Sequence, residues 1–193
     1  LGPGVRALAW AEQVHGAEVV SLGRGSKASG VFCAGRCDAL LTDVPGVAVV
    51  VWTADCVPLV LVGQGLVAAV HAGWRGAAAG VVVNAIRHLE VECECDPADL
   101  TAVVGPAVGP CHYQVGPEVL SRLAASGPEP AAWQRGDRVD LRAFVKAQLM
   151  SAGVNRVVTV GGCTACDPSL ASYRRDGDAA GRQWTLAFTP AGP

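Results

Sequence analysis

The sequence predicts a single α/β domain built on a mixed sheet or on two packed sheets. The chain has 193 residues, of which 51% are hydrophobic and only 17% are charged, so it can bury one large core. Apolar runs of strand type alternate with segments of helical period, in the order strand, strand, strand, helix, strand, helix, helix, strand. This order is typical of α/β proteins. We therefore expect residues 1–193 to form one domain.

The first half of the chain is predicted to consist mainly of strands. The alternation from Ala17 to Val20 predicts the first strand, whereas the stretch 22–35, rich in Gly, Ser and Ala, predicts a mobile surface loop. Further runs of strand type follow at 38–43, 47–53, 57–62 and 66–71. Because the second and last of these runs are almost wholly apolar, we expect strands that are buried on both faces.

The second half is predicted to alternate between helices and strands. After His71 the apolar residues recur at helical spacing, so a helix follows a strand and a glycine turn. Asp140 is a good N-cap for a later helix whose apolar stripe belongs to the core. The predicted elements are helices at 78–89, 117–125 and 141–152, and strands at 100–104, 154–160 and 183–189.

Charge and hydropathy argue against two classes of partner. A net charge of −2 without any run of Lys and Arg offers no basic surface for nucleic acid. No segment reaches the roughly 18 uninterrupted apolar residues of a membrane helix, and the first residues lack the features of a signal peptide. We expect a cytoplasmic protein with reduced cysteines that acts on a small molecule, as a monomer or weak homo-oligomer. Because the chain begins at Leu1 rather than Met, we expect an N-terminal piece to be missing.

The polar residues at the ends of buried strands form the candidate site. Two apolar runs end at Asp55-Cys56 and at His71, and strand ends can bring a thiol and an imidazole together although they lie 15 positions apart. With His15, which precedes the first strand, the set is that of a catalytic zinc site with an open fourth position, and it would also bind copper. Without a metal, Cys56 and His71 form a candidate nucleophile and base, oriented by Asp55 or Gln13.

Several cationic and loop residues extend this inventory. The turn at 72–76 precedes a predicted helix, whose free N–H groups and dipole favour an anion, and Arg75 adds a charged fork suited to phosphate or carboxylate. Tyr173 is followed by two adjacent guanidiniums, Arg174 and Arg175. A rigid Gly/Pro loop carries Cys111 and His112, and His112 is a possible further metal donor.

A CxxC pair is less promising. Cys163 and Cys166 follow a predicted strand, but Asp-Pro comes next rather than a helix, and no second CxxC supports a zinc knuckle. We therefore do not expect this pair to be functional.

Six fragments resemble, in order and across nearly the whole chain, the YfiH-like family, known both as multicopper polyphenol oxidase (laccase) and as purine nucleoside phosphorylase. They are QVHGAEV, TADCVPLVLV, VAAVHAGWRGAAAGVV, GPAVGPCHYQVGPEV, VDLRAFVKAQLMSAGV and CTACDPSLASYRRDGDAAGRQ. The resemblance implies an α/β/β/α sandwich and a zinc ion held by His15, Cys56 and His71. It also implies phosphorolysis of adenosine, inosine and methylthioadenosine, with adenosine deamination as a side activity.

The resemblance also guides the expected roles. We expect Cys56, His71 and Arg75 to be catalytic, and we expect substrate to contact Gln13, Arg75, Cys111, His112, Tyr173, Arg174 and Arg175. Two departures from the family pattern matter. Residues 111–116 are CHYQVG where members usually have CCYEVG, so a His replaces a Cys beside the site. Only fourteen residues precede His15, so we expect a pocket that lacks part of its N-terminal wall.

Three alternatives remain open on the sequence. A copper oxidase acting on phenols would want an axial Met or similar ligand, but the only methionine, Met150, lies in a predicted core helix, and four histidines are too few for a multicopper site. A metal-free cysteine hydrolase would use Cys56 and His71. A non-catalytic binding module stabilised by zinc would have the same metal ligands but would catalyse no reaction.

Overall fold

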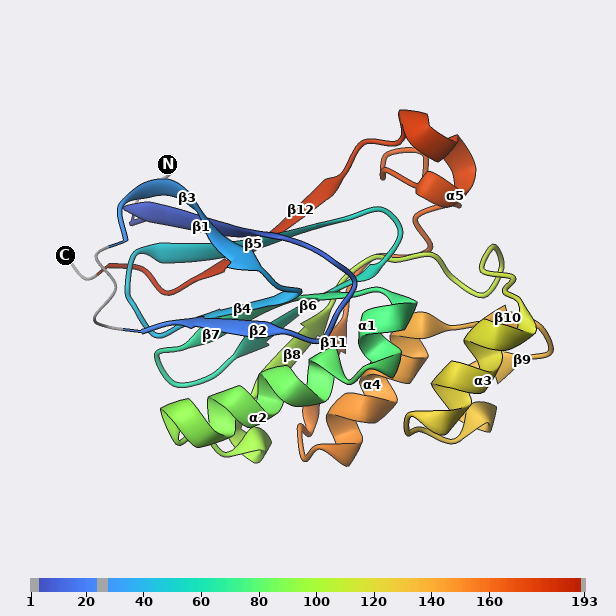
Figure 1. Cartoon of the computed structure of the whole chain (residues 1–193), viewed down its shortest axis with the longest axis horizontal. Coiled ribbons are helices and arrows are strands. Elements are labelled where there is room, and N and C mark those ends of the chain that lie inside the picture. The colour runs from blue at the N-terminus through green and yellow to red at the C-terminus, as the bar shows by residue number, and fades with distance from the viewer. Residues whose placement is uncertain (1–3, 24–27, 192–193) are drawn as a thin grey trace.

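The structure, a computed structural model, describes residues 4–23 and 28–191. It confirms the predicted α/β class with mixed sheets (Figure 1). A layer of helices covers one face of a six-stranded sheet, and a four-stranded sheet packs against the other face. No helix in the described ranges is long and apolar enough to cross a membrane.

The six-stranded sheet has the order β11-β8-β6-β7-β4-β2. The four central strands, β8, β6, β7 and β4, run antiparallel to one another, whereas the outer pairs β8–β11 and β2–β4 are parallel. As a result, three strands end and three strands begin at one edge of this sheet. Its strands are Val19–Leu22 (β2), Ala39–Thr42 (β4), Val57–Val62 (β6), Val67–Ala72 (β7), Thr101–Val104 (β8) and Arg156–Thr159 (β11).

The four-stranded sheet has the order β12-β5-β1-β3, in which β1 is parallel to both of its neighbours and β12 is antiparallel to β5. Its strands are Ala7–Glu12 (β1), Gly30–Arg36 (β3), Val47–Thr53 (β5) and Gln183–Phe188 (β12). The predicted loop at 22–35 was therefore wrong over its last part, because pairing with β1 stabilises β3 although most of its residues are exposed. Residues 24–27 of that predicted loop lie outside the described residues.

Two apolar cores lie on the two faces of the six-stranded sheet. One core joins this sheet to the helices and includes Leu59 and Phe144, and the other joins the two sheets and includes Leu40 and Val49. All six residues of β7 are buried, as expected for a strand covered on both faces. Within the described ranges no helix covers the outer face of the four-stranded sheet, where Trp10, Trp52 and Trp184 pack in a row.

The helices largely follow the predicted boundaries. They are Trp74–Ala78 (α1), Val81–Cys93 (α2), Pro117–Ala125 (α3), Leu141–Ser151 (α4) and Tyr173–Asp176 (α5). Asp140 caps α4 as predicted, since its carboxylate accepts from Ala143 N at 3.0 Å. The predicted helix after His71 is split in two because Gly80 adopts a left-handed φ of 88°.

Short elements complete the chain. They are 3-10 turns at Pro97–Asp99, Pro130–Ala132 and Gly177–Ala179, and a small hairpin of Gln134–Arg135 (β9) with Arg138–Val139 (β10).

Candidate functional site

Two loops and the end of one strand bring the predicted metal ligands together at one edge of the six-stranded sheet. His15 precedes β2, Cys56 immediately precedes β6, and His71 lies near the end of β7, so the strand directions place all three at the same edge. Their ligand atoms lie within 4.8 Å of one another. The two imidazole rings meet edge to face, with centroids 4.8 Å apart and planes at 80°.

The buried carboxylate of Asp38 holds both histidines. His71 donates its Nδ1–H to Asp38 Oδ1 at 2.7 Å, so Nε2 is the nitrogen that can act as a ligand once a metal displaces its proton. The backbone N–H groups of Val14, His15 and Gly16 donate to the same carboxylate at 3.2, 3.0 and 2.7 Å. These bonds hold the backbone of His15 in the left-handed region, at φ 58°, a conformation that residues other than glycine rarely adopt.

Asp38 was missed by the sequence reasoning. It lies directly before β4, a strand in which all four residues are buried. An isolated acid at the start of so apolar a strand was the signal available, because buried carboxylates are rare unless they are paired.

The electrostatics of the metal-free cluster favour a thiolate beside a charged imidazole. Burial alone would raise the pKa of Cys56, but hydrogen bonds from His15 and His71 outweigh it and lower the pKa to about 7. Burial likewise opposes the charge on His71, yet contacts with Asp38 and Cys56 raise its pKa to about 9. The pKa of Asp38 is lowered, because hydrogen bonds from His71 and the backbone outweigh its burial. The cluster thus presents sulfur in the form that binds metals.

The cluster residues fit a metal ion with three protein ligands. Two imidazoles and one thiolate form a donor set found in zinc sites that keep the fourth position open. Gly73 passes directly behind the cluster, and a Cβ there would lie 2.9 Å from His15 Cδ2 and 3.0 Å from Cys56 Sγ. Glycine at this position therefore leaves the room in which the two ligands converge.

The cluster opens onto a pocket of about 440 Å³. Arg75 lies over the Trp74 ring at 4.5 Å, and Arg174 lies over the Tyr113 ring at 5.4 Å. Among the residues that the structure describes, no carboxylate forms an ion pair with either guanidinium. The pocket is lined by His15, Ala54, Asp55, Cys56, Trp74, Arg75, Val108, Tyr113, Leu141, Tyr173, Arg174 and Arg182.

Asp55 is fixed in the wall of this pocket by two donors from distant segments. The Thr164 hydroxyl donates to Oδ1, and the backbone N–H of Arg174 donates to Oδ2 at 2.7 Å. The Asp55 carbonyl accepts from Val108 N at 3.1 Å. Asp55 therefore joins the start of β6 to the loops that follow β8 and β11.

Comparison with known proteins identifies the family. The family model described as multi-copper polyphenol oxidoreductase laccase matches residues 1–189. The chain belongs to this family, and its YfiH-like character is confirmed by its relatives. It is 34% identical to a protein named purine nucleoside phosphorylase YlmD from Geobacillus stearothermophilus, over 92% of this chain and 69% of that protein. It is 36% identical to one named purine nucleoside phosphorylase YfiH from Shigella flexneri, over 86% of this chain and 68% of that protein.

Solved structures of the YfiH-like family share the fold. The crystal structure of YlmD from Geobacillus stearothermophilus matches with a TM-score of 0.86 and 29% identity, and covers 96% of this chain and 74% of its own. A Bacillus licheniformis protein titled hypothetical protein YfiH matches with a TM-score of 0.84 and 27% identity, over 93% of this chain and 73% of its own.

The other predicted substrate-binding residues of this YfiH-like chain divide into two groups. Tyr173 and Arg174 line the pocket, as their position at the start of α5 allows. Gln13 does not line it, because its side-chain amide pairs with the backbone of Trp52, donating to the carbonyl at 2.8 Å and accepting from the N–H at 2.9 Å. Gln13 thus ties the loop of His15 to the end of β5.

Arg175, Cys111 and His112 also lie away from the lining. The Arg175 guanidinium donates to three backbone carbonyls and pairs with Asp176 at 2.7 Å, so it holds the loop before α5 together. Cys111 and His112 lie in a separate group with the CxxC cysteines.

The predicted anion site at a helix N-terminus takes a different form. Helix α1 has only five residues, so its dipole contributes little, and positive charge at the pocket comes from the guanidiniums.

Tyr113 was not predicted as a site residue. Burial is the main cause that raises its pKa to about 12, so its hydroxyl stays protonated at neutral pH and can donate.

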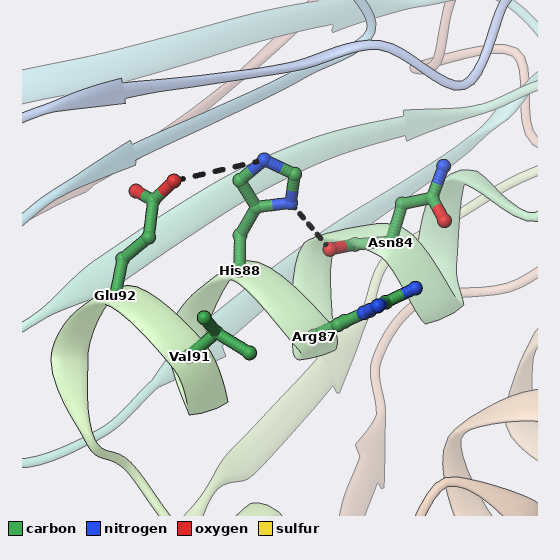
Figure 2. A pocket seen from close by; sticks show the side chains of 5 residues that line it. All are labelled: Asn84, Arg87, His88, Val91 and Glu92. Atoms are coloured by element: carbon green, nitrogen blue, oxygen red, sulfur yellow. Dashed lines mark hydrogen bonds and ion pairs between the residues drawn. The ribbon is translucent and has the colours of Figure 1, made fainter.

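A second depression, of about 280 Å³, lies along α2 and is unrelated to the cluster (Figure 2). All of its lining residues come from this one helix. His88 donates Nδ1–H to the Asn84 carbonyl at 2.9 Å, and its Nε2 lies 3.9 Å from a Glu92 carboxylate oxygen. These are ordinary contacts of a solvated helix face, and they supply no site.

Proposed function

We propose that this chain is a zinc-dependent purine nucleoside phosphorylase that converts adenosine, inosine or methylthioadenosine and phosphate to the free base and the pentose 1-phosphate. One observation carries the proposal: the guanidiniums of Arg75 and Arg174, which form no ion pair with a carboxylate in the described part of the chain, face the same pocket as a Cys/His cluster that could hold a metal ion. The names of the relatives support it.

Phosphate would bind between Arg75 and Arg174. Guanidinium forks match phosphate oxygens bidentately, and stacking on Trp74 and Tyr113 restricts both side chains before substrate arrives. Arg174 is also held by Nη1–H donation to the Gln114 carbonyl at 3.3 Å. Both guanidiniums are therefore partly ordered in the free protein, so less conformational entropy is lost when phosphate binds.

The nucleoside would occupy the aromatic part of the pocket. Tyr113, Tyr173 and Trp74 offer ring faces for a flat purine, and Leu141 and Val108 complete the apolar wall. The protonated Tyr113 hydroxyl can donate to a ring nitrogen or to a sugar oxygen.

In the reaction, a phosphate oxygen bonds to the anomeric carbon while the glycosidic C–N bond breaks and its electron pair leaves with the purine. The arginines bring phosphate to the sugar, and the negative charge of the phosphate stabilises the positive charge that develops on the sugar. A zinc ion held by His15, Cys56 and His71 would supply Lewis acidity at the open side of the cluster. Asp38 keeps the His71 proton on Nδ1, so the other ring nitrogen stays available as a ligand.

The test is phosphate-dependent release of ribose 1-phosphate from inosine by zinc-loaded protein. Arg75→Ala should lower kcat/KM for phosphate by about 100-fold, because one charge-assisted donor is worth about 3 kcal/mol in such a transition state. Arg87→Ala, on the solvated face of α2, is the matched control and should keep full activity. Failure of the fully metal-loaded protein to form the corresponding pentose 1-phosphate from any of the three nucleosides would refute the proposal.

A copper-dependent phenol oxidase is the second candidate, favoured by the description of the family model. The Cys/His set could also take copper. Met150 cannot serve as an axial ligand, since it is 58% exposed on α4 and does not line the pocket. A visible thiolate-to-copper absorption band with oxygen-dependent oxidation of a phenol would support this candidate over the phosphorylase.

A further inference from the structure

A second group of possible metal ligands lies outside the pocket lining. Cys111 and His112 belong to the loop after β8, and Cys163 and Cys166 belong to the loop after β11. Because β8 and β11 are parallel neighbours, both loops leave the sheet at the same edge. The parallel pairing continues past the strands through a bridge between Ala107 and Cys163.

The distances in this group match those around a tetrahedral metal. His112 Nδ1 lies 3.3 Å from Cys111 Sγ, 3.7 Å from Cys163 Sγ and 3.4 Å from Cys166 Sγ. The Sγ atoms of Cys111 and Cys166 are 3.5 Å apart, and all four ligand atoms lie within 4.8 Å of one another. With Zn–S bonds of about 2.3 Å and Zn–N bonds of about 2.0 Å, tetrahedral ligands lie about 3.8 Å (S to S) and about 3.5 Å (S to N) apart.

The surroundings are shaped to hold these sulfurs close together. The backbone N–H of Gly109 donates to Cys163 Sγ at 3.1 Å, a bond that favours the thiolate. A Cβ on Gly109 would lie 3.1 Å from Cys163 Cβ and 3.4 Å from Cys111 Sγ, so a side chain there would push the two loops apart. All three cysteines are free thiols, and two of them are exposed, so apolar packing does not explain why they converge.

We propose that Cys111, His112, Cys163 and Cys166 bind a second zinc ion in a closed, structural site. Three thiolates and one imidazole form a donor set of structural zinc sites, and four protein ligands leave no open position for a substrate. None of the four residues lines the pocket. This proposal does not depend on the proposed phosphorylase activity.

The second zinc ion would clamp together two loops that build the pocket. Tyr113 directly follows His112, and Thr164, which donates to Asp55, lies between the two cysteines of the CxxC pair. The ion would therefore fix the pocket wall from outside. Its loss should loosen substrate binding without removing a group that touches the reacting atoms.

The experiment measures zinc bound per chain and the spectrum of the cobalt-substituted protein, prepared under reducing conditions. A Cys56→Ser variant disables the pocket cluster and should still bind about one zinc per chain, with a cobalt charge-transfer band typical of several thiolates. In that background, Cys166→Ser and, separately, His112→Gln should each weaken zinc binding at least tenfold and change the cobalt band. Cys33→Ser, at an exposed thiol on β3, is the matched control and should change neither.

The outcomes separate this proposal from the proposed function. Wild-type protein should bind about two zinc ions if both clusters are occupied. If it bound one, and Cys56→Ser also bound one, the second site would stand and the pocket site would fail. Cys56→Ser protein that binds no zinc would overturn the second site. So would zinc uptake that both Cys166→Ser and His112→Gln leave unchanged, or a disulfide that forms among the three cysteines while zinc is in excess.

Discussion

Asp38→Asn is the change that tests most directly how the metal cluster is organised. The carboxylate accepts from His71 Nδ1 and from three consecutive backbone N–H groups, and it is buried. Asparagine has nearly the same shape, but it carries no charge and replaces one acceptor oxygen with an NH₂ group. That group would face at least one of the same donors, so hydrogen bonds are lost without leaving a cavity.

The size of the effect follows from these contacts. Hydrogen bonds to a charged acceptor are worth about 1.5 to 3 kcal/mol each, and leaving a buried donor unpaired costs a similar amount, so we expect about 3 kcal/mol of lost stability in the metal-free protein. Loss of the carboxylate behind a histidine ligand typically weakens metal binding by about 10- to 100-fold. His15 should contribute to this loss, because its left-handed backbone depends on the same carboxylate.

The assay combines competitive zinc titration against a chelator with unfolding of the metal-free protein by urea. Asp99→Asn, at an exposed acid, is the matched control. Because the pKa of Asp38 is lowered, its stabilisation is fully present above the unfolded value of 3.8 and is lost as the pH falls through the lower folded value. The Asp38→Asn protein should lack this acid-sensitive part of its stability. Zinc affinity within twofold of wild type would refute the role given to Asp38.

Three further predictions concern the same site. Gly73→Ala should weaken zinc binding at least tenfold while the protein stays folded by circular dichroism, because its Cβ would lie 2.9 Å from the His15 ring. In the metal-free protein, alkylation of Cys56 should accelerate as the pH rises through about 7, whereas Cys37, whose burial raises its pKa to about 11, should stay unmodified; peptide mass mapping would separate the two. Thr164→Val should raise KM with little change in kcat, because it removes one hydrogen bond to Asp55 without touching the cluster. A fall in kcat as large as the fall in kcat/KM would contradict this.

Two of the three cluster residues could be predicted because apolar runs stop where the site begins, whereas the assignment of His15 depended on the family resemblance. Val47–Thr53 and Val67–Ala72 are nearly all buried, so Cys56 and His71 stood out against a hydrophobic background. Their convergence could be expected, since strands of one sheet deliver residues to a common edge. The strand Gly30–Arg36 could not be predicted in this way, because its pattern is mostly exposed and it forms through pairing with its neighbour.

The second cysteine cluster illustrates what local sequence omits. From the sequence, Cys163 and Cys166 did not predict a metal site, because no second pair of metal ligands lies near them in the chain. Cys111 and His112 lie about fifty positions earlier, and only the parallel pairing of β8 with β11 places them opposite the CxxC turn. β8 and β11 follow one another in the six-stranded sheet and are joined through helices α3 and α4. A crossover of about fifty residues therefore brings the two loops together, and no pattern close to either cysteine pair in the chain shows it.

The order of strands in the six-stranded sheet explains how one edge holds both clusters. Along that edge lie the end of β11, the end of β8, the start of β6, the end of β7, and the starts of β4 and β2. A slip of one residue between β6 and β7 would turn every side chain of β6 to the opposite face and separate Cys56 from His71. That slip is blocked because Val57, Leu59 and Leu61 are fully buried in the helix-side core. The positions of Cys56 and His71 are therefore determined by how β6 and β7 pack in the core, and not only by the loops at the edge of the sheet.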